Sequence, residues 1–103
     1  MQRTTDPRGR NMRCVWRIPY EPSYEAHYAM YPSRLVETPI KAGCPEGGLV
    51  LDPFMGSGTT AVVARRLGRN YIGFEPNSEY AAICHKRLTQ TTLTLRTDET
   101  QLR

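Results

Sequence analysis

Two short apolar runs with a helical pattern between them dominate the middle of the chain. The runs cover residues 48–52 and 70–74, and glycine or proline lies close to both ends of each. Short continuous apolar runs of this kind are typical of buried strands in a parallel sheet. Residues 58–67 carry apolar side chains at helical spacing, and Gly68 is suited to a left-handed helix stop. The pattern predicts two strands joined by a helix.

A helix is also expected before this unit, from Ser33 to about Ala42. Its apolar residues fall on one side, at Leu35, Val36 and Ile40. Pro39 lies inside the segment and, because proline removes a backbone donor and clashes with the preceding turn, should kink or split the helix.

A last helix is expected from Asn77, a good N-cap residue, to about Thr89. Its apolar face comprises Tyr80, Ile83, Cys84 and Leu88. The residues from 90 to 103 are mostly polar and are interpreted as a tail, in which the alternating segment 92–96 could add a short edge strand.

The order strand, helix, strand, helix predicts an α/β fold, a partial doubly wound Rossmann-like sheet with a right-handed crossover. A helix and an extended arm precede it, which divides the chain into an arm (1–26), a ligand-binding subdomain (27–89) and a polar tail (90–103). A parallel sheet normally carries helices on both faces. Two strands with these helices cannot cover both faces, so we expect exposed apolar surface and further structure elsewhere.

Length and composition restrict the function only loosely. The chain has 103 residues, enough for one domain at most, and a formal net charge of +4. Arginines crowd the first seventeen residues, at Arg3, Arg8, Arg10, Arg13 and Arg17. Such an arm is suited to lie along phosphates, but a solvated arm explains the same pattern, and both interpretations stay open.

The cysteines and histidines suggest neither a disulfide framework nor a metal site. The three cysteines show no Cys-x-x-Cys spacing, and Cys84 falls on an apolar helix face where packing explains it. The two histidines are fifty-eight positions apart. With no signal peptide and no apolar run of about 18 residues, we expect a reduced cytoplasmic compartment and no membrane contact.

The segment that joins the first strand to its helix carries the candidate chemistry. Gly56 and Gly58 permit positive φ and lack the Cβ atoms that keep a ligand away from the backbone. Unpaired N–H groups at the start of the next helix would face that ligand. Glu75 follows the second strand, twenty-three positions after Asp52, where nucleotide-binding sheets hold ribose hydroxyls. These features predict a site for an adenosine-type cofactor.

The loop alone does not decide between cofactors. Gly56-x-Gly58-x-x-Ala61 satisfies the dinucleotide fingerprint, but residues 52–55 separate its first glycine from the strand and nearly fifty residues precede that strand. A phosphate-binding P-loop is excluded, because no Gly-Lys-Ser/Thr follows. An acid at a strand end suits a cofactor that carries an ammonium group, and S-adenosylmethionine is such a cofactor. A dinucleotide remains the distant alternative.

Three segments in the right order resemble the S-adenosylmethionine-dependent DNA amino-methyltransferases, which modify adenine N6 or cytosine N4. Residues 52–60, Asp-Pro-Phe-Met-Gly-Ser-Gly-Thr-Thr, resemble that family's main cofactor motif. Residues 69–75, with the later Arg87-Leu88 pair, resemble its next motif, whose acid binds the ribose. Residues 27–35 resemble the His-x-Ala-x-x-Pro-x-x-Leu segment around the methionine end, and residues 9–16 its lead-in.

The resemblance implies a set of cofactor-binding residues: His27, Ala29, Pro32, Asp52, Pro53, Phe54, Gly56, Ser57, Gly58, Thr59, Thr60 and Glu75. Asp52 would bind the ammonium group, or alternatively cap its own loop. Phe54 would form a wall for the adenine or the methionine, or alternatively be a buried turn aromatic. Glu75 would bind the ribose.

One departure from the family decides how far the resemblance extends. The family's catalytic motif, Asp/Asn/Ser-Pro-Pro-Tyr/Phe/Trp, grips the amino group of a flipped base. It does not occur in these 103 residues, and Ile18-Pro19-Tyr20 matches only its end. The resemblance therefore implies the C-terminal, cofactor-binding part of a DNA methyltransferase, whose catalytic and DNA-reading half is separate. A remnant that binds the cofactor without turnover is the alternative.

Overall fold

The computed structural model describes residue 9, residues 12–22 and residues 30–101, with side chains described as far as Arg96. In chain order the elements are α1 (Ser33–Gly43), β1 (Leu49–Asp52), α2 (Thr59–Arg66), β2 (Asn70–Gly73) and α3 (Ser78–Gln101). The expected α/β order is confirmed, with boundaries shifted by at most one residue except at the end of α3.

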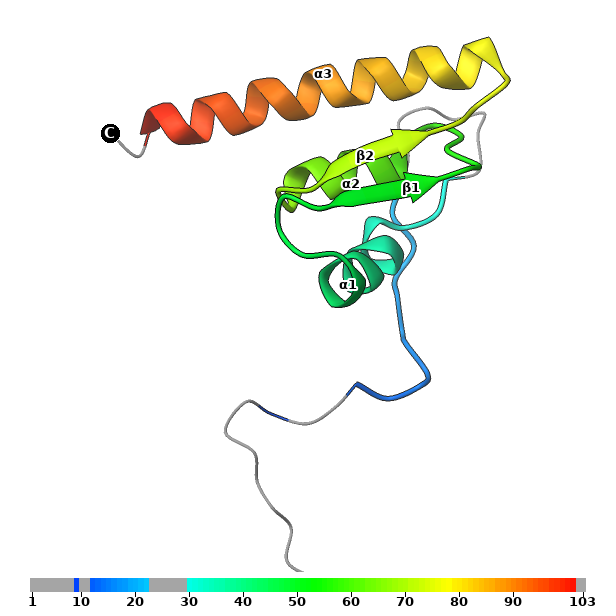
Figure 1. Ribbon diagram of the computed structural model, residues 1–103, viewed down its shortest axis with the longest axis vertical. Helices are drawn as coiled ribbons and strands as arrows, with labels where there is room; N and C mark the ends of the chain where they lie inside the picture. Colours follow the sequence, from blue (N-terminus) through cyan, green and yellow to red (C-terminus); the bar gives the residue numbers. More distant parts are fainter. Residues whose placement is uncertain (1–8, 10–11, 23–29, 102–103) are drawn as a thin grey trace, which may run out of the picture.

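The two strands form a parallel pair with Leu49 opposite Asn70 and Asp52 opposite Gly73. The backbone pairing continues past the strands, since the Phe74 N–H donates to the Asp52 carbonyl at 3.1 Å. Both strands therefore end at the same edge of the sheet (Figure 1). This edge brings the loop after β1 beside the residues that follow β2.

All three helices lie on one side of the sheet, with α2 in the middle (Figure 1). Val50 and Tyr71, which are register partners, turn toward α2 and pack against its buried residues. The core comprises two clusters on either side of α2, one with α1 and one with α3: Ile40, Val63 and Ala64, and Met55, Ala61, Val62 and Leu88.

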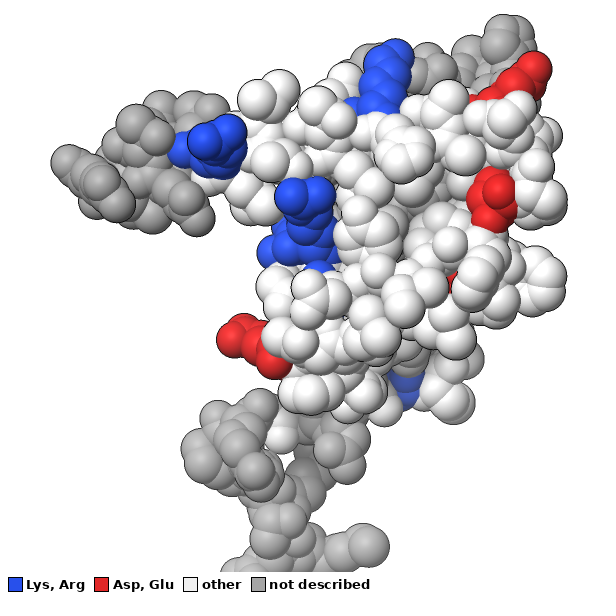
Figure 2. Space-filling model, turned by 45° about the horizontal axis from the view of Figure 1, so that its top comes forward, with Lys and Arg blue, Asp and Glu red and all other residues white. Residues whose placement is uncertain are grey.

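The opposite face of the sheet has no covering layer among the described residues. Leu49, Leu51, Ile72 and Phe74, which we call the open sheet face, are between 45% and 62% exposed. The prediction of a fully buried first strand is therefore wrong on this side, whereas the expected exposure of apolar strand surface is confirmed. In Figure 2 much of the visible surface is uncharged, with acidic and basic side chains in separate spots.

The open sheet face should make the isolated chain self-associate, because contiguous exposed apolar side chains beside unpaired strand edges favour association. Changing Leu51→Lys should lower that association without lowering the melting temperature, since the side chain is already in solvent. Gln90→Lys, an equal charge change at an exposed position of α3, is the matched control. Sedimentation velocity across a concentration series measures the effect, and a chain that stays monomeric throughout would contradict it.

Two expectations about helices differ from the structure. α1 continues through Pro39, so the predicted split is wrong, while the predicted kink stays a prediction. α3 does not end near Thr89 but runs to Gln101, so the segment 92–96 is helical and not an edge strand. The threonine hydroxyls in this half of α3 find acceptors within the helix, because each donates to the carbonyl four residues earlier: Thr89, Thr91, Thr92 and Thr94. No glycine or proline after Asn77 interrupts the helix.

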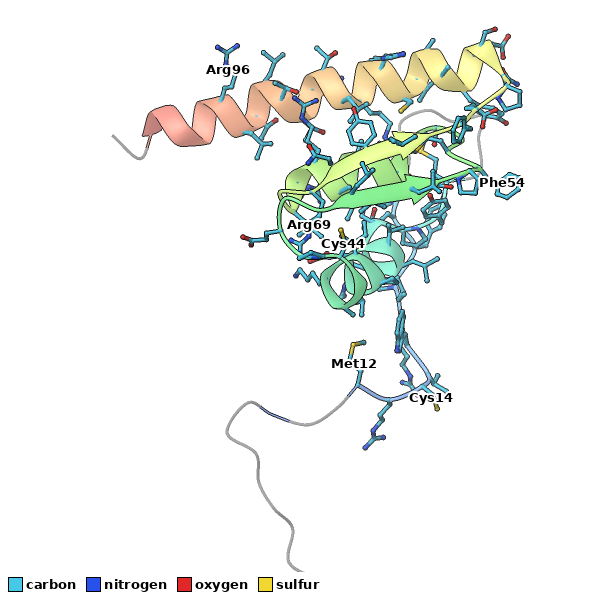
Figure 3. All side chains as sticks on the ribbon, viewed as in Figure 1. Met12, Cys14, Cys44, Phe54, Arg69 and Arg96 are labelled. Carbon is cyan, nitrogen blue, oxygen red and sulfur yellow. The ribbon has the colours of Figure 1, made fainter. Side chains whose placement is uncertain are left out.

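The predicted ends of the elements around the strands are confirmed in detail. The Asn77 side chain accepts a hydrogen bond from the Glu79 N–H at 2.9 Å, as an N-cap residue does. Gly68 stops α2 with a φ of +75°. At the edge opposite the glycine loop, the Arg69 guanidinium donates to the Cys44 carbonyl at 2.9 and 3.1 Å and so joins the end of α1 to the start of β2 (Figure 3).

The described part of the arm, residues 12–22, contains no helix or strand. It is attached to the first turn of α1, because the Glu21 carboxylate accepts hydrogen bonds from the Ser33 N–H at 3.1 Å and from its hydroxyl at 2.9 Å. A carboxylate at this place also suits the positive end of the helix dipole. Figure 3 shows Met12 and Cys14 on the arm, away from the strands.

Candidate cofactor site

The glycine loop is a tight turn whose conformation only glycine adopts easily. Gly56 has a φ of +58° and Gly58 a φ of +89°, as expected from the sequence. The turn is closed by the Gly58 N–H, which donates to the Met55 carbonyl at 3.0 Å. Helix α2 begins directly after it, and its first backbone bond runs from the Val62 N–H to the Gly58 carbonyl. The N–H groups of the preceding positions have no intrahelical acceptor.

Asp52 caps its own loop and also binds across it. One carboxylate oxygen accepts the Phe54 N–H at 2.9 Å, and the other accepts the Thr60 hydroxyl at 2.6 Å. The Tyr31 hydroxyl lies 2.6 Å from the Thr60 hydroxyl and donates to it, because the Thr60 proton is used on Asp52. Oδ1 accepts only the Phe54 N–H among the described contacts, so Asp52 can still accept from an ammonium group there.

Tyr31 is a site residue that the sequence analysis did not single out. It lies inside the 27–35 segment. Only the structure shows that its hydroxyl contacts the Thr60 hydroxyl and lies 3.4 Å from the Asp52 carboxylate. Burial raises the pKa of Tyr31, so its hydroxyl remains a proton donor through the neutral range.

Glu75 contacts the glycine loop, as its position after the neighbouring strand predicts. One of its oxygens accepts the Gly56 N–H at 2.8 Å, and the other accepts the Asn77 N–H at 2.9 Å. The carboxylate is therefore held between the loop and the start of α3. Its half-buried side chain faces the same edge of the sheet as Asp52.

The surroundings of the two glycines differ. A Cβ on Gly56 would meet nothing within 4 Å, so a ligand can approach the backbone there. A Cβ on Gly58 would collide with Cys84 of α3, whose Sγ is the nearest atom and whose Cβ would lie at 2.9 Å. Packing against α3 is therefore a second reason for glycine at position 58, and the expected close approach of a ligand to its backbone stays a prediction.

The hydroxyls of the two threonines that open α2 are not exposed. Thr59 is 2% exposed and its hydroxyl is bound by Arg87 at 3.0 Å, while Thr60 is held by Asp52. Both hydroxyls are therefore used in contacts within the protein. Burial lowers the pKa of Arg87, although a guanidinium stays protonated at any physiological pH.

Phe54 is 85% exposed and projects beyond the carboxyl ends of the strands (Figure 3). The interpretation of Phe54 as a buried turn aromatic is therefore wrong. Pro53 beside it is exposed as well, and Pro32 lies next to Tyr31 at the start of α1. His27 and Ala29, the other two candidates, lie outside the described residues.

A cleft of about 390 Å³ separates α1 from β1 and opens beside Asp52. Its polar end is formed by Tyr31, Asp52 and Thr60, and its walls are apolar side chains of α1 and β1. Apolar walls with a few polar groups at one end are typical of small-molecule sites. The described residues contain no cluster of three metal-binding side chains and no helix long and apolar enough to cross a membrane.

Comparison with known proteins assigns the family. Residues 1–86 match the family model for N6/N4 methyltransferases, described as DNA methylase, and the chain belongs to this family. The Type II methyltransferase M.SmaI of Serratia marcescens is 44% identical over 79 residues, which cover 77% of this chain and 27% of the relative. The Type II methyltransferase M2.DpnII of Streptococcus pneumoniae is 44% identical over 84 residues, 78% of this chain and 31% of the relative.

Solved structures show the same fold. M1.HpyAVI in complex with SAM superimposes with a TM-score of 0.59 at 38% identity, covering 66% of this chain and 34% of that chain. M1.HpyAVI alone gives a TM-score of 0.55 at 42% identity, covering 57% of this chain and 30% of that chain. The Rossmann-like methyltransferase fold is thus confirmed, and the chain spans about a third or less of the proteins it matches.

Proposed function

We propose that this chain is the cofactor-binding C-terminal portion of a site-specific DNA methyltransferase. The complete enzyme would transfer a methyl group from S-adenosylmethionine to the exocyclic amino group of adenine (N6) or cytosine (N4). The observation that carries the proposal is the contact between Glu75 and the Gly56 N–H at the carboxyl edge of two parallel strands. Membership of the DNA methylase family and a structural neighbour in complex with SAM support it.

The charges at this edge match the charges of the cofactor. Asp52 would bind the methionine ammonium, and the free N–H groups at the start of α2 would bind the methionine carboxylate. Glu75 would accept hydrogen bonds from the ribose hydroxyls, and it need not release Gly56, because a carboxylate oxygen accepts more than one hydrogen bond. The bound cofactor would supply the electrophilic methyl group.

The remaining candidates would complete the pocket. Exposed Phe54 would be covered by the adenine or the methionine, which would explain why so large an apolar side chain projects into solvent. His27, Ala29 and Pro32 would surround the methionine end, as the family motif implies. Pro53, Ser57, Thr59 and Thr60 would shape the loop and present its backbone.

Catalysis would require a second part of the enzyme. The catalytic tetrapeptide does not occur in these 103 residues, so DNA binding and base flipping would belong to an N-terminal half. The absence of the tetrapeptide also keeps one alternative open, a remnant that binds the cofactor without turnover. The two proposals agree on the cofactor and differ in whether a catalytic half exists.

Titration calorimetry with S-adenosylmethionine and with NAD tests the cofactor. S-adenosylmethionine should bind more tightly, and Glu75→Gln should weaken it by about tenfold to a hundredfold, since hydrogen bonds to a charged group contribute roughly 1.5–3 kcal/mol. Glu46→Gln is the matched control, because Glu46 is exposed in the turn before β1, at the opposite end of the strands. NAD binding as tightly as S-adenosylmethionine, or equal affinities for the two glutamine variants, would contradict the proposal.

A further inference from the structure

One turn of α3 packs directly against the back of the glycine loop. The Arg87 guanidinium nitrogen Nη1 donates to the Ser57 carbonyl at 3.0 Å, and it lies 3.3 Å from the Ser57 hydroxyl. The same nitrogen donates to the Thr59 hydroxyl at 3.0 Å. It therefore bridges the residues on either side of Gly58, while Cys84, one turn earlier in α3, fills the space beside Gly58 itself.

These contacts hold the start of α2 without capping it, because a guanidinium has no acceptor for the first N–H groups of the helix. The N-cap position of α2 is Gly58, which has no side chain to cap the helix, and no side-chain cap is formed there. A side-chain cap would accept a hydrogen bond from one of those N–H groups. Here the entry direction is fixed from outside, because Arg87 holds the Ser57 carbonyl and the Thr59 side chain toward α3.

The orientation of these groups determines what the loop offers to a ligand. Thr59 is almost completely buried against Arg87, so its hydroxyl cannot turn toward the open side of the loop. The loop is held at its other end by Glu75, which accepts the Gly56 N–H at 2.8 Å. A loop held in its binding conformation before the ligand arrives binds more tightly than one that must be ordered on binding.

We infer that Arg87 is a positioning residue that sets cofactor affinity by fixing the 56–58 loop, an inference that rests on the proposed cofactor site. Arg87 touches no cofactor atom in this account and acts through Ser57 and Thr59. Its alternative role is purely structural, as one of several contacts between α2 and α3. The two roles differ in what they predict for a folded variant.

Four variants of the full chain separate the roles, and one of them, Arg87→Ala, leaves room for added guanidinium. Arg87→Met keeps the length of the side chain and removes its donors, Arg87→Lys keeps the charge but has one ammonium in place of the planar guanidinium, and Arg65→Met is the control at an exposed position of α2. Calorimetry with S-adenosylhomocysteine gives the affinity. Circular dichroism melts identify a temperature at which every variant is folded.

Arg87→Met should weaken binding by about tenfold to a hundredfold, because it removes hydrogen bonds from a charged donor. The affinity of Arg87→Lys should be intermediate, and that of Arg65→Met should match the affinity of the unmodified chain. Guanidinium added at concentrations far below denaturing should restore part of the affinity of Arg87→Ala. A purely structural role would lower the melting temperature of Arg87→Met and leave the affinity of the folded variant unchanged, which would overturn the inference. If Arg87→Met does not fold, unchanged affinity in Arg87→Lys and no restoration by guanidinium would overturn it equally. An unmodified chain that binds no S-adenosylhomocysteine would instead refute the proposed function.

Discussion

Gly58→Ala should destabilise the chain by about 2–5 kcal/mol, whereas Gly56→Ala should cost only about 1–2 kcal/mol. Both glycines have positive φ, so both alanines pay for a left-handed conformation. Only the alanine at position 58 also places a Cβ against Cys84, where the nearest atoms belong to the side chain and the backbone of α3. Because a domain is typically stable by about 5–15 kcal/mol, the first change removes a large share of the total.

Gly58→Ala should also lose cofactor binding even where it remains folded, since relieving the collision moves the start of α2 away from α3. Urea unfolding of the two variants measures the stability difference, and calorimetry with S-adenosylhomocysteine measures the binding. Gly56→Ala is the matched control for the stability measurement, with the same substitution two residues earlier in open space. Equal unfolding free energies for the two variants would show that packing against Cys84 is unimportant.

The local features of the fold could be predicted because they are determined by neighbouring residues. The Asn77 cap, the Gly68 stop and the positive φ of Gly56 each follow from what one residue type does in a given place. The adjacency of Glu75 to the glycine loop also follows, because parallel strands end at the same edge of a sheet. This adjacency is the part of the site on which the cofactor proposal depends.

The contacts between distant elements could not be predicted in the same way. Tyr31 meets Thr60 across twenty-nine positions and Arg87 meets Thr59 across twenty-eight, and no local pattern encodes either pair. The packing role of Gly58 could not be predicted for the same reason, because its packing partner is on α3. The length of α3 was misjudged because threonine favours strands by its own propensity, while the hydroxyl bonds to preceding carbonyls accommodate it in this helix.

The isolated chain and the complete enzyme should differ in methyl transfer to DNA. The isolated chain should transfer no detectable methyl group to duplex DNA, because transfer needs a flipped base whose amino nitrogen is aligned on the methyl group. The described structure contains the proposed cofactor site and the open sheet face. The sequence lacks the tetrapeptide that would grip the base. We propose that the open sheet face is covered in the complete enzyme by the half that carries this tetrapeptide.

A chimera supplies the missing half in a defined way. In M.SmaI, the 79-residue segment that matches this chain would be replaced by the corresponding residues of this chain. The chimera should methylate DNA, and the same chimera with Glu75→Gln should be strongly impaired. A chimera that folds and binds S-adenosylmethionine but never methylates would favour the non-catalytic remnant.

Labelling of duplex DNA from tritiated S-adenosylmethionine, with the purified chain alone and with the chimera side by side, distinguishes a cofactor-binding part from a complete enzyme. We expect label in the DNA with the chimera and none above background with the chain alone, although the chain alone should bind the cofactor. Label transferred to DNA by these 103 residues without any partner would contradict it.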